Sequence, residues 1–174
     1  MDIRIIKSKN IYSGRVFSLK QDLVSLPNGH EVLLDIITHN GAVVIVPIDE
    51  LGHIWFVKQY RHATGEILLE LPAGTLEEGE SPESCLLREI REEIGMATSK
   101  IRKIGEFFIA PGYSTEYLHI FLAENLTSSP LQGDLDEMIT IEKIPIPSAY
   151  LLAENGQIRD AKTLAALLLV KKYL

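Results

Sequence analysis

The chain has 174 residues, 46% of them hydrophobic, so it is long enough for one domain with a proper core and too short for two independent ones. Its formal net charge of -7 argues against nucleic acid or an anionic membrane surface as the main partner, because both attract clustered basic residues. The single cysteine, Cys85, allows no internal disulfide, and no apolar run resembles a signal peptide or a membrane span, so we expect a soluble, cytoplasmic protein.

The amino-terminal part predicts a β-hairpin. Two strand-like segments, 16–26 and 31–38, flank Pro27-Asn28-Gly29, whose fixed and positive backbone angles suit a tight turn. We expect residues 1–40 to form a β extension that packs on the core or on a partner, and residues 41–174 to form the main domain.

Beyond residue 41 the pattern predicts strands that alternate with helices. Short apolar runs predict buried strands at 43–46, 54–57, 107–109 and 118–122. A helix is predicted from Pro82 to Ile94, because Ser81-Pro82 offers a cap and a first-turn proline and Gly95 commonly ends a helix. Two further helices are expected, one starting near residue 147 or 148 and one over 161–173. The elements predict an α/β fold.

The predicted helix 82–94 carries an apolar stripe and an acidic face. The stripe consists of residues that recur at spacings of three and four, namely Leu86, Leu87, Ile90 and Ile94. Glu89, Glu92 and Glu93 lie at i, i+3 and i+4 on another face, where their like charges repel. A divalent cation reverses this repulsion, and carboxylate oxygens suit Mg2+ or Mn2+. The alternative, a merely solvated face, is favoured for a charge cluster taken alone.

The context of this helix resembles a known motif. The residues Gly74-Thr75-Leu76-Glu77-Glu78-Gly79-Glu80, seven more, and Arg88-Glu89-Ile90-Arg91-Glu92-Glu93-Ile94-Gly95-Met96 match the Nudix box at every defining position. The resemblance implies a Nudix α/β/α sandwich with a mixed sheet, and a hydrolase in which two or three Mg2+ (or Mn2+) ions help water to attack a diphosphate.

The same resemblance implies roles for individual residues of the box. The implied metal ligands are the Ala73 carbonyl and the carboxylates of Glu89 and Glu93, with Glu92 as a further ligand or a holder of water. Glu92 and Glu93 are therefore also catalytic candidates. Arg88 would orient the glutamates, Glu80 would support the loop, and Gly74 would permit a close approach of backbone, metal and substrate.

Residues outside the box indicate the substrate, because the box alone defines only the chemistry. Gln59-Tyr60-Arg61, Glu70-Leu71-Pro72-Ala73-Gly74, and Pro111 at fifteen residues after Met96 look like the pattern of ADP-ribose and ADP-sugar pyrophosphatases. This resemblance, which extends over nearly the whole chain, implies hydrolysis of ADP-ribose to AMP and ribose 5-phosphate by a homodimer. A pyrophosphatase for another nucleotide sugar or dinucleotide, such as GDP-mannose or NADH, is the alternative, and a non-catalytic domain that senses ADP-ribose is a minor one.

The candidate substrate-binding residues are Arg61, Tyr60, Glu70, Gly74 and Glu116. The planar guanidinium of Arg61 suits a phosphate, with an ordinary surface ion pair as the alternative. Glu70 could accept a hydrogen bond from a ribose hydroxyl or an adenine edge, and Glu116 could reach the terminal ribose, unless both are ordinary loop carboxylates. Tyr60 could stack on a base, whereas Trp55 lies in an apolar run and is expected in the core.

The catalytic base is the least defined part of the site. In the enzymes that the chain resembles, the base is usually a glutamate on a loop well after the box, and the matching stretch here is 132–139. Asp134, Asp136 and Glu137 all remain candidates, with Glu137 preferred, and exposed-loop acidity is the alternative.

Overall fold

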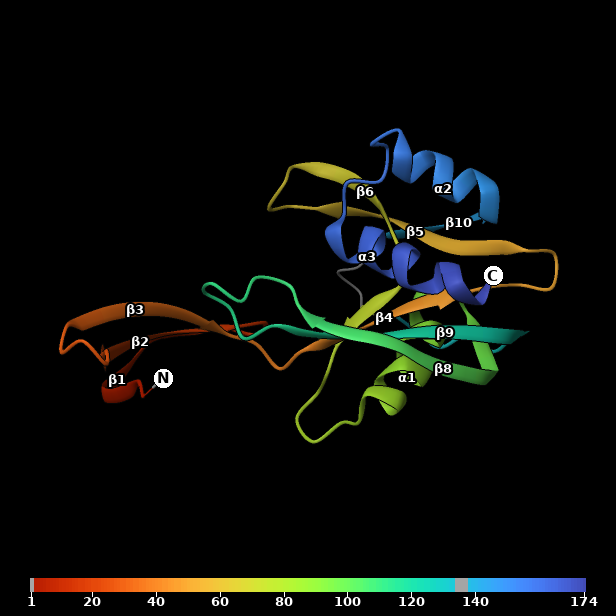
Figure 1. Cartoon of the computed structure of the whole chain (residues 1–174). Coiled ribbons are helices and arrows are strands. Elements are labelled where there is room, and N and C mark those ends of the chain that lie inside the picture. Colours follow the sequence, from red (N-terminus) through yellow and green to blue (C-terminus); the bar gives the residue numbers. More distant parts are fainter. Residues whose placement is uncertain (1, 134–137) are drawn as a thin grey trace. The chain divides into compact units, whose positions relative to one another are not determined.

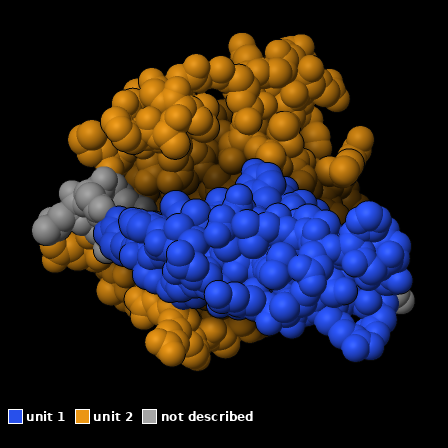
Figure 2. Space-filling model, turned by 90° about the vertical axis from the view of Figure 1, so that its left-hand side faces the viewer, with its two compact units in different colours: residues 1–41, 107–118 blue, residues 42–106, 119–174 orange. Residues whose placement is uncertain are grey.

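The computed structural model describes residues 2–133 and 138–174, which form two compact units (Figure 2). Unit 1 comprises residues 1–41 and 107–118, and unit 2 comprises residues 42–106 and 119–174. The first boundary lies beside the one expected at residue 40, but the segment 107–118 interrupts the expected main domain. No helix in the described part of the chain is both long and apolar enough to cross a membrane.

Unit 1 is built around a three-stranded antiparallel sheet in the order β1-β2-β3 (Figure 1). Strands β2 (Ser18–Ser25) and β3 (Glu31–Thr38) form the predicted hairpin, and Gly29 adopts a φ of 82° in its turn. Strand β1 (Arg4–Ser13) was not predicted. All its residues are exposed, so no buried face imposes an alternation on its sequence.

The segment 107–118 joins unit 1 through backbone hydrogen bonds to β3. The amide of Ile37 donates to the carbonyl of Tyr113 (2.8 Å), and the amide of Thr115 donates to the carbonyl of Ile37 (2.9 Å). These two bonds attach the turn around Pro111 to the end of the hairpin.

Unit 2 contains two sheets. The four-stranded sheet has the order β7-β4-β9-β8, and the three-stranded antiparallel sheet has the order β10-β5-β6. The strand bounds are β4 (Ala42–Pro47), β5 (His53–Arg61), β6 (Glu66–Glu70), β7 (Ala73–Thr75), β8 (Met96–Phe108), β9 (Tyr117–Ser128) and β10 (Ile139–Pro145). The predicted runs at 43–46, 54–57 and 118–122 lie inside β4, β5 and β9, and 107–109 overlaps the end of β8. The short strands β6 and β7 were not predicted.

All three predicted helices are confirmed: α1 (Pro82–Glu93), α2 (Ile146–Glu154) and α3 (Ala161–Val170). The third helix was expected to reach residue 173, and its last turn is the 3-10 helix η1 (Lys171–Tyr173). Asp160 caps α3 by accepting a hydrogen bond from the Thr163 amide (3.0 Å).

The core of unit 2 lies on both faces of β4, where all six residues are buried. Val43 and Ile45 belong to the cluster that includes Leu86 and Ile90 of α1, and α3 also contacts β4. Because neighbouring strand residues face opposite sides, β4 is covered by α1 on one side and α3 on the other (Figure 1). This arrangement confirms the predicted α/β/α class, and Trp55 lies in the core as expected.

Candidate active site

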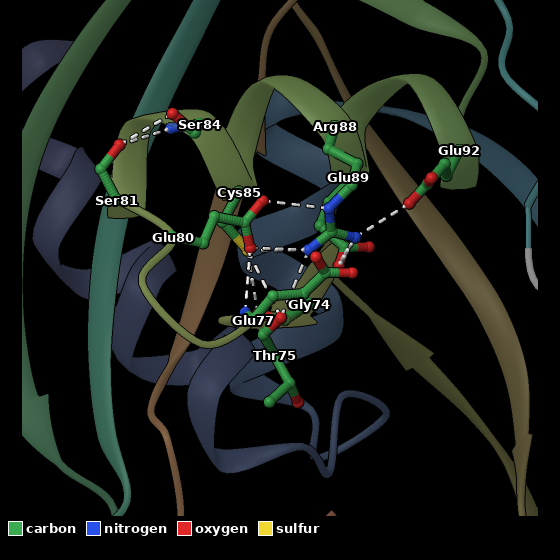
Figure 3. Close-up of polar contacts among 10 residues, drawn as sticks. All are labelled: Gly74, Thr75, Glu77, Glu80, Ser81, Ser84, Cys85, Arg88, Glu89 and Glu92. Atoms are coloured by element: carbon green, nitrogen blue, oxygen red, sulfur yellow. Dashed lines mark hydrogen bonds and ion pairs between the residues drawn. The ribbon is translucent and has the colours of Figure 1, made fainter.

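The loop that follows β7 enters α1 through a well-formed helix start. The hydroxyl of Ser81 accepts a hydrogen bond from the Ser84 amide (3.1 Å), and Pro82 occupies the first turn (Figure 3). Gly95, with a φ of 68°, follows the last turn. Both helix ends are thus defined locally, which fixes the acidic residues of α1 relative to β7.

The buried face of α1 differs from the predicted stripe. Leu87 is 42% exposed, so its placement in the stripe was wrong, and the buried Cys85 lies on this face instead. The helix is rotated so that its buried face also includes Glu89 and Glu93, which are only 8% and 7% exposed. These two carboxylates therefore lie at the edge of the core, not on a separate face.

Gly74 allows Glu89 to lie directly against the backbone of β7. A Cβ atom built on Gly74 would lie 1.8 Å from both Cδ and Oε1 of Glu89, far inside van der Waals contact. Any side chain at position 74 would displace this carboxylate or the strand. The lack of a side chain at Gly74 thus makes room for the Glu89 carboxylate beside β7.

A single guanidinium, that of Arg88, contacts three carboxylates (Figure 3). It donates from Nε and Nη2 to the two oxygens of Glu80 (3.1 and 3.0 Å), and from Nη1 to Glu89 (2.6 Å) and Glu92 (3.0 Å). Its Nη2 also lies 3.3 Å from the carbonyl of Thr75. Arg88 therefore joins Glu80 of the loop to Glu89 and Glu92 of α1 in one network.

The same network changes the acidity of its members. The hydrogen bonds from Arg88 hold the pKa of Glu80 below its ordinary value, and a hydrogen bond from the Glu77 amide acts in the same direction. Burial raises the pKa of the Cys85 thiol, and the charges of Glu89 and Glu80 raise it further. Cys85 is therefore a protonated residue of the core.

Two of the implied metal ligands contact each other. The amide of Ala73 donates a hydrogen bond to Oε2 of Glu93 (3.0 Å), which ties the end of α1 to β7. The site thus holds the carboxylates of Glu80, Glu89 and Glu92 on the guanidinium of Arg88, and that of Glu93 on the backbone of β7. Among the residues described, no three Asp, Glu, His or Cys side chains already form a group that could hold a metal ion.

Arg61 and Glu70, two candidate substrate-binding residues, form an ion pair in which Glu70 is buried. Arg61 donates from Nε and Nη2 to the two oxygens of Glu70, and each donor–acceptor distance is 2.8 Å. Lys162 makes a second ion pair with Glu70. Burial alone would raise the pKa of Glu70, but the hydrogen bond from Arg61 and the charge of Lys162 outweigh it and lower the pKa. Both Glu70 oxygens are therefore engaged within the protein.

The acidic groups around Arg61 raise its pKa. Its pKa is raised first by the hydrogen bond to Glu70 and further by the negative charges of Glu93 and Asp160. The side chain keeps 39% of its surface exposed. Arg61 therefore forms the ion pair that was the alternative to phosphate binding, and it still exposes part of its cationic side chain.

Of the remaining candidate site residues, two lie outside the box and three lie outside the described residues. Tyr60 is exposed on β5, with its ring centre 6.2 Å from that of His62. Glu116 belongs to unit 1, where its amide donates to the Ser114 hydroxyl (3.1 Å). The candidate bases Asp134, Asp136 and Glu137 lie outside the described residues, and β10 begins shortly after them at Ile139.

Sequence reasoning gave no site role to α3, yet two of its residues contact the segment before the box. Lys162 pairs with Glu70, and Thr163 accepts a hydrogen bond from the Leu71 amide (2.8 Å). In each pair the partners are 92 positions apart. Residues this far apart in the chain share no local pattern that could have pointed to these contacts.

The box geometry and the α/β/α fold define a class, the hydrolases that act on diphosphates linked to a nucleoside. The model of the NUDIX domain matches residues 38–167, which is most of the chain. The chain belongs to the Nudix family and is a Nudix hydrolase of the ADP-ribose pyrophosphatase-like type.

Relatives and a solved structure are similar along almost the whole chain. An ADP-ribose pyrophosphatase of Bacillus subtilis (strain 168) is 37% identical, over 96% of this chain and 91% of its own. A methanol dehydrogenase activator of Bacillus methanolicus is 34% identical (94% and 89% covered), and an ADP-ribose pyrophosphatase of Mycobacterium tuberculosis (strain ATCC 25618 / H37Rv) is 36% identical (97% and 83%). The crystal structure of an ADP compounds hydrolase superposes with a TM-score of 0.90 at 25% identity, covering 100% of this chain and 95% of that one.

Proposed function

We propose that this Nudix pyrophosphatase hydrolyses the diphosphate of ADP-ribose to AMP and ribose 5-phosphate, with Mg2+ or Mn2+ as the metal. The observation that carries the proposal is the geometry of the box, in which Glu89 lies directly against Gly74 and Glu93 accepts a hydrogen bond from the Ala73 amide, so that the implied metal ligands meet at β7. Two relatives more than 35% identical that bear the name ADP-ribose pyrophosphatase support this substrate.

The residues of the box fit a hard divalent cation. Three carboxylates share the guanidinium of Arg88, and a fourth, that of Glu93, accepts a hydrogen bond from the Ala73 amide. A cation relieves this excess of negative charge, and carboxylate oxygens are the ligand type that Mg2+ prefers. The Ala73 carbonyl, Glu89 and Glu93 would hold the ion, with Glu92 as a further ligand. When bound, the metal neutralises charge on the diphosphate and activates water.

The chain's own residues would bind and orient the substrate and move the proton. Arg61, held from one side by Glu70, can donate hydrogen bonds from its exposed surface to a phosphate. Because both oxygens of Glu70 are engaged, we assign Glu70 to the orientation of Arg61 in preference to direct contact with ribose or adenine. Tyr60 would stack on the base, Glu116 would reach the terminal ribose, and Glu137, Asp136 or Asp134 would accept the proton from the attacking water.

A panel of substrates tests the proposal. ADP-ribose, ADP-glucose, GDP-mannose and NADH are incubated with Mg2+ or Mn2+, and the products made in isotopically labelled water are identified by mass spectrometry. We expect ADP-ribose to give AMP and ribose 5-phosphate fastest, and a chelator to abolish the reaction. Faster cleavage of GDP-mannose or NADH would contradict the proposed substrate.

Two substitutions test the metal ligands separately from the substrate. Glu89→Gln and Glu93→Gln preserve size and remove a charge that a divalent ion needs, so each should nearly abolish metal-dependent AMP release while the circular dichroism spectrum is retained. Glu83→Gln, on the first turn of the same helix, is the matched control and should keep activity. Full activity in either ligand variant would reject the assigned site.

We also propose that the enzyme is a homodimer. The support comes from unit 1, where the sheet and the residues beside its strands expose many large apolar side chains, an uncommon feature for a surface that faces only water. These are Ile3, Ile5, Ile6, Ile11, Tyr12, Val16, Phe17, Val32, Leu33 and Leu34. A two-fold dimer is the commonest arrangement that would cover such a surface.

A further inference from the structure

Thr163 is a polar residue of α3 that has no exposed surface. Its hydroxyl accepts a hydrogen bond from the Leu71 amide (2.8 Å) and donates one to Oδ2 of Asp160 (2.6 Å). A carboxylate can only accept, so the hydroxyl proton is directed at Asp160 and an oxygen lone pair is left for Leu71. The orientation of this hydroxyl is therefore fixed by the helix cap.

Leu71 lies two residues before Ala73, whose backbone carbonyl is proposed to bind the metal. The carbonyl of Pro72 accepts a hydrogen bond from the Ile45 amide (2.9 Å), and the amide of Ala73 donates to Glu93 (3.0 Å). The chain from Leu71 to Ala73 is thus held at three consecutive residues by three different elements: α3, β4 and α1. Of these three contacts, the one from α3 involves a residue that lies outside both the box and its sheet.

We propose that Thr163 is a positioning residue that sets the affinity of the site for its divalent cation. Its hydroxyl fixes Leu71 and, two residues further along, the distance between the Ala73 backbone and Glu93. Loss of the hydroxyl frees this segment to shift, so the positions of two implied ligands, Ala73 and Glu93, are no longer fixed relative to each other. The inference rests on the proposed metal site.

A purely structural role, as part of the α3 cap, is the competing explanation. Asp160 also accepts a hydrogen bond from the backbone amide of residue 163, and this bond does not depend on the side chain there. Thr163→Val is nearly isosteric, keeps the backbone bond and removes both hydroxyl bonds. Thr163→Ser keeps the hydroxyl and is the matched control.

The test measures Mn2+ binding to the whole protein without nucleotide, by electron paramagnetic resonance of the free ion. Substitution of residues that orient metal ligands commonly weakens metal binding tenfold or more, so Thr163→Val should bind Mn2+ about tenfold more weakly. Thr163→Ser should retain the affinity of the unmodified protein. Equal affinity in a folded Thr163→Val protein would overturn the proposal.

Amide hydrogen exchange and kinetics supply readouts that a cap alone would not change. In Thr163→Val, exchange should accelerate at Leu71 and Ala73, and the Mg2+ concentration for half-maximal activity should rise while KM at saturating Mg2+ stays constant. Unchanged exchange at both amides would refute the proposal. If Thr163→Val does not fold, Asp160→Asn takes its place, because the amide weakens the charge-assisted bond and should reduce Mn2+ affinity by about threefold; unchanged affinity in that variant would also refute it.

The test of Thr163 can fail independently of the test of the proposed function. Failure of the unmodified protein to hydrolyse ADP-ribose would reject the substrate, whereas the comparison of Mn2+ affinities uses no nucleotide. A normal rate of ADP-ribose hydrolysis combined with equal Mn2+ affinities would reject the role of Thr163 and leave the function standing.

Discussion

Arg88 carries the charge balance of the box, because it is hydrogen-bonded to Glu80, Glu89 and Glu92 at once. Without it, the carboxylates of α1 would repel one another over distances that solvent screens only in part. A bound divalent cation and Arg88 therefore neutralise the same carboxylates. Arg88 does so whether or not the ion is bound.

Replacement of Arg88 by Met should change the pH dependence of stability. Arg88 depresses the folded-state pKa of Glu80, so the stabilisation is present above the ordinary value of about 4.5 and is lost as the pH falls through the folded-state pKa. The difference in Tm between the unmodified protein and Arg88→Met should thus be constant from pH 6 to 8 and shrink below about pH 4.5.

Thermal unfolding followed by circular dichroism across this pH range measures the effect. Arg91→Met is the control, since Arg91 lies on the same helix and its Nε donates to the Ser129 carbonyl (3.1 Å). A Tm difference for Arg88→Met that is as large at pH 4 as at pH 7 would show that Glu80 is not stabilised through this contact.

Gly74→Ala should inactivate the enzyme with little loss of fold. The added Cβ would overlap the Glu89 carboxyl, which lies 1.8 Å from its position, so Glu89 must leave its place beside β7. Because a displacement of about 1 Å at a catalytic group can cost about 100-fold in rate, we expect kcat to fall by about that factor. Thr75→Ala, at the next position, has an exposed side chain and should keep its activity. Equal kcat values for the two variants would disprove the close approach.

At the scale of elements, the position of α1 depends on its amino-terminal cap. Ser81→Ala removes the acceptor for the Ser84 amide and should lower the free energy of unfolding by about 1 kcal/mol, whereas Ser81→Asn should change it by only a few tenths. Urea unfolding measures both variants. If Ser81→Asn were as unstable as Ser81→Ala, the serine would be acting through something other than its cap.

The helices could be predicted because their signals are local. Ser81, Pro82 and Gly95 mark the ends of α1 in the sequence itself, and the structure places the helix between them. Which way the helix faces is decided by its neighbours, so the exposure of Leu87 and the burial of Glu89 were not predictable from periodicity. Strand β6 has no alternation, because its three apolar residues are consecutive, and β7 has only three residues.

The candidate site likewise has contacts that a local motif predicts and contacts that depend on packing. The box residues follow one another on one loop and one helix, so their contacts with Arg88 follow from a recognisable motif. The contacts of Glu70 and Leu71 with Lys162 and Thr163 depend on how α3 packs, and a pair 92 residues apart has no signature in a single sequence. The ion pair of Glu70 with Lys162 could not be predicted for that reason.

For the whole molecule, the surface of unit 1 is the feature that its own fold does not explain. Its strands β1 and β3 expose apolar side chains although the chain as a whole has a net charge of -7. Such a charge keeps separate molecules apart, so an association must offset the repulsion through buried apolar area. The proposed dimer should therefore be strengthened by salt, which screens the charge, and weakened by new charge on the sheet.

Leu33→Glu tests this expectation. Leu33 on β3 is 57% exposed, so a charge there should leave the fold of the subunit intact but should oppose its burial against a second copy. Sedimentation equilibrium should show a dimer for the unmodified protein and a marked shift towards monomer for the variant. Leu51→Glu, at an 83% exposed leucine of unit 2, adds the same charge elsewhere and should leave the dimer in place. If both variants dissociate equally, net charge alone governs association, and if neither does, the sheet of unit 1 is not the interface.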